Sequence, residues 1–182
     1  AGWVDADNDP ATPRTALGAP GIAVDAPLAL SLYVSPDASQ QAAAQVIQQG
    51  LAACGFQMTL QTLPPAEYLA AGPAGPVFGR SFDLALFAFP AAELPPCNLF
   101  LSREIPGEYP AFSKGWGGVN AAGYASPAFD RACTSARTAL PGDPALLQDF
   151  ALAQSLLAQD LPFLPLYWQE RVIVTRSGIS VP

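Results

Sequence analysis

The chain contains no histidine among its 182 residues. Imidazole is the usual general base of serine and cysteine hydrolases and a common zinc ligand, so its absence excludes Ser-His-Asp catalysis, Cys-His catalysis and imidazole metal sites. The sequence also has no C-x-x-C pair, which leaves zinc-ribbon and thioredoxin-type sites without support. We therefore expect a chain with no catalytic residue, no metal and no cofactor.

Positive charge is also scarce, with 8 Lys and Arg against 15 Asp and Glu and a net charge of −7. The basic residues are scattered, whereas a surface that follows phosphates needs them clustered, so we expect no nucleic-acid binding. No window approaches eighteen consecutive apolar residues, so no membrane-spanning helix is predicted. The stretch from Ala1 lacks a basic start followed by an apolar run, and there is no initiator Met, so we expect a mature protein or an excised piece of one.

The three cysteines are Cys54, Cys97 and Cys133. An odd count in an exported protein indicates one disulfide and one buried thiol. Cys54 is predicted on the apolar face of a helix, where a thiol packs as a small hydrophobe. The sequence therefore predicts a Cys97–Cys133 disulfide, with three reduced, buried thiols as the alternative.

A hydrophobic content of 51% is enough for one α/β domain with a real core. Residues 1–26 are rich in turn-forming residues and are expected to be irregular. Asp5, Asp7, Asn8 and Asp9 have spacing reminiscent of a calcium loop, but the glycine and distal Glu of an EF-hand are missing. A polar hairpin or connecting loop is the alternative.

Residues 27–34 alternate apolar side chains and predict a strand. Ser35, Pro36 and Asp37 predict a helix start capped by Ser35, and Gly55 predicts its end. The expected apolar face of this helix comprises Ala43, Val46, Ile47, Gly50, Leu51 and Cys54. Residues 56–63 predict a second strand, so the unit is strand–helix–strand with parallel strands. A short helix over 64–72 and a third strand over 81–89, apolar enough for the sheet centre, follow.

Residues 90–125 have little periodicity, and a loop this long in a compact domain is often functional. Ser126-Pro127 and Asp143-Pro144 each predict a helix start. The inner faces are expected to carry Phe129, Cys133 and Ala136 in the first helix, and Leu146, Leu147, Phe150, Ala153 and Leu157 in the second. PFLPLYWQ and ERVIVTR are expected to be extended.

The order of these segments is similar to that of one protein family. The chain has AGWVDAD, then LALSLYV and QGLAACGFQMTLQTL, where a helix ends in Leu-x-x-x-Gly between two strands. It continues with FDLALFAFPAAELPPC, WGGVNAAGYASPAFD and LAQSLLAQDLPFLPLYW. The run over 123–168 is the most characteristic part. Together these motifs resemble the C-terminal lobe of the extracellular solute-binding proteins of family 5, which feed peptide and nickel ABC importers.

The resemblance implies a periplasmic-binding-protein-like (type II) α/β lobe, with a mixed sheet flanked by helices. Residues 27–182 would form a single ligand-binding lobe, a fragment of a larger two-lobed protein. It also implies a small solute or peptide as ligand, a membrane permease of an ABC importer as partner and a monomeric state. The implied location is extracytoplasmic in a bacterium, in the periplasm or anchored at the cell surface as a lipoprotein.

The resemblance places ligand contacts around the end of the third strand. Members commonly have a Trp at the position of Phe89 that packs on the ligand, and a core aromatic is the alternative. Peptide binders have an Asp three residues later that pairs with the peptide ammonium. That position is Ala92 here and Glu93 is the nearest acid, so either Glu93 substitutes or the ligand has no ammonium at this point.

Three residues of the glycine-rich segment, Trp116, Asn120 and Tyr124, are further predicted contacts, because glycines let a ligand approach and aromatics supply flat contact area. The alternatives are packing for the two aromatics and a turn for Asn120. Tyr167 and Trp168 are assigned to the core or the lobe interface. Asp83 and Asp130 are interpreted as structural.

Two other functions remain open. A secreted hydrolase using carboxylates such as Glu93 and Asp83 would need both in one cleft, roughly 5–10 Å apart. A surface adhesion or scaffolding module would expose a large apolar patch and self-associate.

Overall fold

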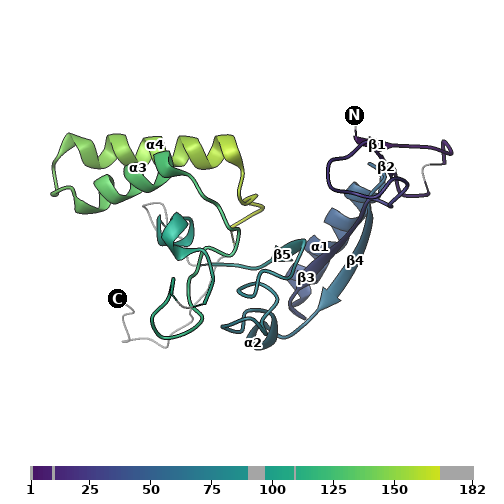
Figure 1. Cartoon of the computed structure of the whole chain (residues 1–182), viewed down its shortest axis with the longest axis horizontal. Coiled ribbons are helices and arrows are strands. Elements are labelled where there is room, and N and C mark those ends of the chain that lie inside the picture. The colour runs from purple at the N-terminus through teal and green to yellow at the C-terminus, as the bar shows by residue number, and fades with distance from the viewer. Residues whose placement is uncertain (1, 10, 90–96, 109, 169–182) are drawn as a thin grey trace, which may run out of the picture.

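The main sheet is a three-stranded parallel sheet in the order β4-β3-β5 (Figure 1). The computed structural model describes residues 2–9, 11–89, 97–108 and 110–168. β3 (Ala29–Val34) pairs with β4 (Gln57–Thr62) and with β5 (Leu84–Leu86), both in parallel. The predicted strand–helix–strand unit is therefore confirmed, with α1 (Ala38–Ala52) as its crossover.

The strand at the sheet centre is β3, so the prediction that residues 81–89 occupy the centre is wrong within the described residues. β3 buries Leu32 and Val34 and has a hydrogen-bonded strand on each side. Leu84 on β5 is 36% exposed, as expected for an edge strand. The chain crosses from β4 to the far side of β3, which places the later strand at the edge.

The helix α1 is capped by Asp37, and the prediction that Ser35 caps it is wrong. The Asp37 carboxylate accepts from the backbone N–H of Ser39 at 3.0 Å and of Gln40 at 3.1 Å. Ser35 lies just before it, buried, where its hydroxyl donates to Gln40 Oε1 and accepts from Asp37 N–H. Asp37 caps because its side chain reaches two free N–H groups of the first turn.

The buried stripe of α1 differs from the predicted one. Ala44 is fully buried, and Ile47 and Leu51 pack against the sheet core beside it. Val46 is 69% exposed because it lies beside this i, i+3, i+7 stripe rather than on it. Cys54 is an exposed free thiol, since α1 ends at Ala52, and its predicted burial is wrong.

The first 26 residues, expected to be irregular with a polar hairpin as one alternative, contain a short antiparallel strand pair. β1 (Gly2–Val4) and β2 (Thr15–Leu17) form an antiparallel pair with Trp3 opposite Ala16. The acidic turn between them is closed by Asp7, whose carboxylate accepts from Thr12 Oγ1 at 2.9 Å and from Asp9 N–H at 3.1 Å. The backbone N–H of Asp9 is the main cause that lowers the pKa of Asp7. Across the described residues no group of three metal-ligating side chains is present.

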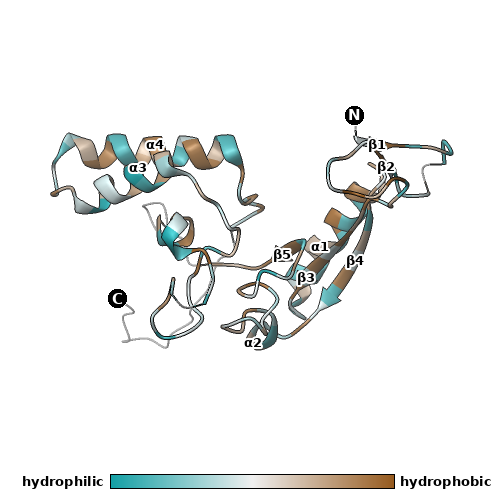
Figure 2. Ribbon diagram, viewed as in Figure 1, coloured by the Kyte–Doolittle hydropathy of each residue, from teal (hydrophilic) through white to brown (hydrophobic). Residues whose placement is uncertain are grey.

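The helices α3 (Pro127–Thr138) and α4 (Pro144–Asp160) form a hairpin at the other end of the molecule (Figure 1). Their predicted starts are confirmed, because Ser126 Oγ accepts from Phe129 N–H and Asp143 Oδ1 accepts from Ala145 N–H. Both helices carry hydrophilic and hydrophobic turns (Figure 2). Six residues of the predicted inner faces are buried: Phe129, Cys133, Ala136, Phe150, Ala153 and Leu157. Ala132, which was not predicted, is buried as well.

One residue of the predicted inner face of α4 is misplaced. Leu147 is 69% exposed, while its neighbour Leu146 packs against the core. Burial on this helix follows the positions that face α3, and Leu147 lies one residue beyond that stripe. Short helical turns complete the described structure: α2 (Pro65–Tyr68), η1 (Cys97–Leu99) and η2 (Ser102–Glu104).

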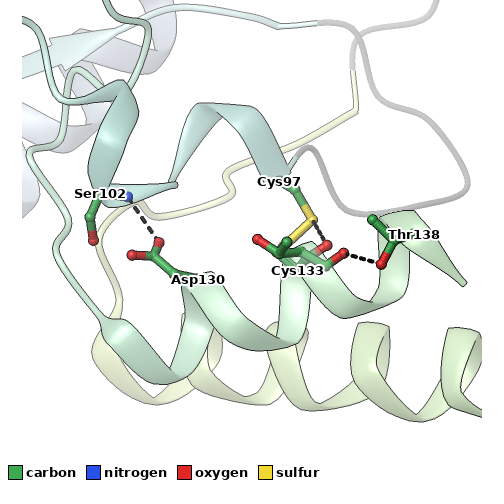
Figure 3. The surroundings of a disulfide bond; sticks show 6 residues. Cys97, Ser102, Asp130, Cys133 and Thr138 are labelled. Atoms are coloured by element: carbon green, nitrogen blue, oxygen red, sulfur yellow. Dashed lines mark hydrogen bonds between the residues drawn. A yellow bond between two sulfur atoms is a disulfide. The ribbon is translucent and has the colours of Figure 1, made fainter. Parts of the chain in front are cut away.

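The predicted disulfide between Cys97 and Cys133 is confirmed, with an S–S distance of 2.04 Å (Figure 3). It joins η1 to the middle of α3, and both cysteines are buried. Around it lies a core cluster that includes Phe100, Leu101 and the buried residues of both long helices.

No helix in the described part of the chain is both long enough and apolar enough to cross a bilayer. Tyr167 and Trp168 are exposed, so they do not lie in the core, and their placement at a lobe interface stays a prediction. The extended segment predicted for ERVIVTR lies outside the described residues.

Candidate ligand-binding site

The carboxyl edge of the sheet lies where β3 ends at Val34 and β5 ends at Leu86. The chain passes from β3 to β4 on one side, and β5 lies on the other side of β3, so the strand order reverses between β3 and β5. Ligands of open α/β sheets bind outside the carboxyl ends of strands at such a reversal. The first candidate residue after this edge is Phe89.

Phe89 packs by its edge on another aromatic ring. Its ring centroid lies 6.0 Å from that of Phe163, with the planes at 71°. Phe163 in turn stacks on Phe100 at 4.7 Å. Phe89 is only partly buried. It therefore packs on an aromatic ring, as the core alternative predicts, and part of its side chain stays accessible to solvent. Its contact with a ligand stays a prediction.

This aromatic chain continues into the helical core. Phe100 meets Phe129 edge to face at 6.4 Å, and Tyr124 meets Phe129 at 5.4 Å. Edge-to-face and offset pairs of this kind each add about 0.5–1.5 kcal/mol beyond burial. The chain thus links the end of β5 to the core around the disulfide. The sequence analysis missed Phe100 and Phe163, because the residues around each of them give no signal that the two rings stack in the fold.

Asn120 is fully buried, and its side chain is used inside the lobe. Its Nδ2 donates to the carbonyl of Leu101 at 3.0 Å and to that of Tyr124 at 2.8 Å, while its Oδ1 accepts from Tyr124 N–H. The backbone N–H of Asn120 donates to Glu104 O at 2.7 Å. The side chain therefore holds η2 and the segment before α3 together, which agrees with the turn alternative.

Tyr124 is half-buried and connects the same segment to the end of α4. Its hydroxyl donates to Asp160 Oδ2 at 2.7 Å. Burial is the main cause that raises the pKa of the Tyr124 phenol, and the neighbouring Asp160 carboxylate raises it further. The neutral phenol is therefore the form that this site holds.

Trp116 is half-buried, and its indole N–H donates to the carbonyl of Phe78 at 2.9 Å. The glycines beside it allow the loop to fold tightly on itself: a Cβ on Gly117 would meet the Phe112 ring at 2.7 Å. Gly118 has a φ of +97°, and a Cβ there would meet Glu104 O at 2.6 Å. These glycines serve loop packing, whereas the sequence suggested close approach by a ligand.

The two carboxylates interpreted as structural have structural partners. Asp83 Oδ2 accepts from both the N–H and the hydroxyl of Ser31 at 2.8 Å, which ties the start of β5 to β3. Asp130 Oδ1 accepts from Ser102 N–H at 2.9 Å, which ties α3 to η2 (Figure 3). Glu93 lies outside the described residues. Of the predicted contacts, the structure brings Asn120 and Tyr124 together and leaves Trp116 against a different segment.

Comparison with known proteins rests on structure. No family model matches the chain, and no curated protein matches it. The solved structure of the oligopeptide-binding protein from Thermus thermophilus, complexed with a pentapeptide, superposes with a TM-score of 0.72 at 20% identity. That match covers 92% of this chain and 28% of the other.

Two further structures have the same architecture. The oligopeptide-binding protein AppA from Bacillus subtilis, in complex with a nonapeptide, matches with a TM-score of 0.64 at 15% identity over 88% of this chain and 28% of its own. The periplasmic binding protein DppA from Helicobacter pylori, in complex with the peptide STSA, matches with a TM-score of 0.55 at 19% identity over 75% and 25%. The chain thus spans little more than a quarter of the solved structures that it matches. The predicted fold class is confirmed: this chain has the α/β fold of one part of a peptide-binding protein of the periplasmic-binding type.

Proposed function

We propose that the chain is the C-terminal lobe of the solute-binding component of an ABC importer, a member of solute-binding family 5. The lobe would contribute one wall of a cleft for a peptide or peptide-like solute. The observation that supports this most strongly is the fold, shared over 92% of the chain with a binding protein that carries a pentapeptide. The sequence motifs independently resemble the same lobe.

The proposed ligand wall lies at the carboxyl edge of β3 and β5. Phe89 would offer its accessible surface to the ligand while its ring packs against Phe163. Trp116 and Tyr124 would contribute flat surfaces from the glycine-rich segment, and Glu93 an acidic group. Asn120 would act on the ligand through the loop that it holds, because its side-chain atoms are already hydrogen-bonded.

The same proposal includes a membrane permease as partner, a monomeric state and an extracytoplasmic location, with a lipid anchor at the cell surface as one form. A disulfide agrees with an oxidising compartment. The proposal includes no metal, no cofactor and no catalytic residue.

The test is calorimetry on the complete protein, including both lobes, against peptide pools and a library of small solutes. Binding to a peptide, weakened by Phe89→Ala, is the expected result. Val24→Ala, at an exposed position of the N-terminal segment, is the matched control. A complete protein that binds none of these compounds would overturn the proposal.

A carboxylate-dependent hydrolase has less support. Asp83 lies at the start of β5, at the opposite end of the strand from Phe89, and its carboxylate is held by Ser31. A catalytic carboxylate must face the cleft and lie within hydrogen-bond reach of the substrate group with which it exchanges a proton. An adhesion module is distinguished by mass, since it would self-associate where the proposed lobe is monomeric.

A further inference from the structure

Two arginines from different elements converge on one shallow hollow beside α3. Arg103 from η2 and Arg137 from the last turn of α3 line it, together with Thr134 and Thr138. The hollow has a volume of about 230 Å³. This is below the roughly 300–1,000 Å³ typical of sites that enclose a small molecule, and suits a single side chain.

Among the described residues, one of the two arginines has an acidic partner. Arg103 Nε forms an ion pair with Glu104 Oε1 at 3.7 Å, which is too long for a good hydrogen bond, and the Arg103 side chain is 68% exposed, so solvent screens the pair. Among the ion pairs of the described residues none involves Arg137. Asp130, the nearest carboxylate on α3, accepts from Ser102 N–H. A cation is stabilised near a helix C-terminus, which explains the position of Arg137 in the last turn of α3. It does not explain why Arg103 lines the same hollow.

A second hollow on the same helix provides a contrast. It lies on the other side of the Thr134–Thr138 ridge and is lined by Asp130 and Arg131, so it holds opposite charges together. Thr138 is shared by both hollows, and its hydroxyl donates to the carbonyl of Thr134 (Figure 3). Of these two hollows among the described residues, the one at Arg103 and Arg137 is flanked by two cations.

We infer that the Arg103–Arg137 hollow is a docking point for an acidic segment of a protein partner. Guanidinium groups bind carboxylates through paired hydrogen bonds, and two of them flanking a hollow of side-chain size fit one Glu or Asp side chain of that segment. The net charge of −7 makes this local site selective, because an acidic segment is repelled by most of the surface. The site lies apart from the carboxyl edge of the sheet and does not rest on the proposed transport function.

The test is an amide-resolved NMR titration of the 182-residue chain with an acetylated, amidated tetraglutamate peptide. We expect shifts concentrated at Arg103, Thr134 and Arg137. Arg103→Gln and Arg137→Gln should each raise the dissociation constant about fivefold, the upper range for one exposed ion pair. Arg131→Gln is the matched control, since it removes the same charge from the same helix and should leave the constant unchanged.

Three outcomes would overturn the inference. Equal binding by tetraglutamine would remove the carboxylate from recognition. Equal shifts with acetate or inorganic phosphate at the same concentration would make the hollow a small-anion site. An equal loss with Arg131→Gln would reduce the effect to net charge. Thermal unfolding of each variant separates misfolding from lost binding, and Arg137→Lys, which keeps the charge without the paired hydrogen bonds, should bind more weakly than the parent chain.

Discussion

Asn120 shows how one polar side chain can organise a segment without regular structure. The amide has no contact with solvent, and it bonds to backbone groups on both sides of the glycine-rich loop. A buried polar group must be satisfied in this way, because leaving it unpaired costs about 1–3 kcal/mol. The loop before α3 therefore depends on a residue that its sequence context marks only as a turn former.

Replacing Asn120 with Ala should lower the free energy of unfolding by about 2–4 kcal/mol, because backbone partners at Leu101 and Tyr124 lose their hydrogen bonds. Chemical denaturation measures this loss. Asn98→Ala, at an exposed position of η1, is the control and should change stability by about 0.5 kcal/mol or less. Equal effects of the two substitutions would contradict the assigned role.

Tyr124 predicts a dependence of stability on alkaline pH. Its pKa is raised above the ordinary 10.0, chiefly by burial, so the folded protein holds the phenol proton more tightly than the unfolded chain does. The stability that this supplies is fully present below the ordinary value and is lost as the pH rises from there towards the folded value. Denaturation across this range should show a smaller loss in Tyr124→Phe than in the parent chain. Asp160→Asn, which removes the neighbouring negative charge, should reduce the loss as well, and an unchanged slope in both variants would refute the interpretation.

At the scale of elements, the helical hairpin is stabilised by packing and by a covalent link. The disulfide lies within a buried cluster of residues from η1, α3 and α4. It closes a loop of 36 residues in separation, and that loop contains the whole glycine-rich segment. The link therefore restricts the unfolded chain in the region that carries the predicted contacts.

Replacing Cys97 and Cys133 together with Ala should lower the free energy of unfolding by about 4 kcal/mol, from the entropy of closing a loop of this length. Urea denaturation of the oxidised parent and the double variant measures the difference. Cys54→Ala is the matched control, since this exposed thiol is free and its loss should cost about 0.5 kcal/mol or less. In the folded parent, a maleimide should label Cys54 alone.

The register of α4 makes a further prediction. Leu157 is buried against α3, so Leu157→Ala should cost about 2–4 kcal/mol, whereas Leu147→Ala, at an exposed position of the same helix, should cost about 0.5 kcal/mol or less. Thermal or chemical unfolding compares the two. Equal costs at the two positions would mean that Leu147 also faces the core, as the sequence pattern indicated.

At the scale of the whole molecule, the buried residues fall into three clusters. One lies between the sheet and α1, and one between α3, α4 and η1. The third, around Tyr68, Val77 and Ala121, joins side chains of β3 and β5 to the glycine-rich segment. The segment between the sheet and the helical hairpin is therefore packed from the sheet side through this middle cluster.

An isolated wall of a cleft should bind its ligand poorly. Sites that enclose a ligand bury most of its surface, and closure of a second lobe by hinge motion supplies the remaining contacts. We expect calorimetry to find no peptide binding tighter than about 0.1 mM for the isolated chain, with much tighter binding to the complete two-lobed protein. Micromolar affinity of the chain alone would contradict the assignment as one wall.

Local patterns were sufficient for much of the fold. The caps at Ser126 and Asp143, the left-handed Gly55 and the alternation before Val34 each act over a few residues, so the elements that they bound could be predicted. The elements on either side of these signals could also be placed in order, and that order is the basis of the predicted fold class.

The sequence by itself determined the α/β class, the parallel β3–β4 pair and both long helices, because capping and periodicity are local. It predicted the Cys97–Cys133 disulfide but left three reduced thiols open, and the structure decided between them. Only the tertiary structure decided that β3 is the central strand, that Val46 and Leu147 face solvent, and that Phe89 reaches Phe163. It also decided that Asn120 points inward. These outcomes depend on which distant segments meet, and residues far apart in the chain carry no local signal of the partner that they will find.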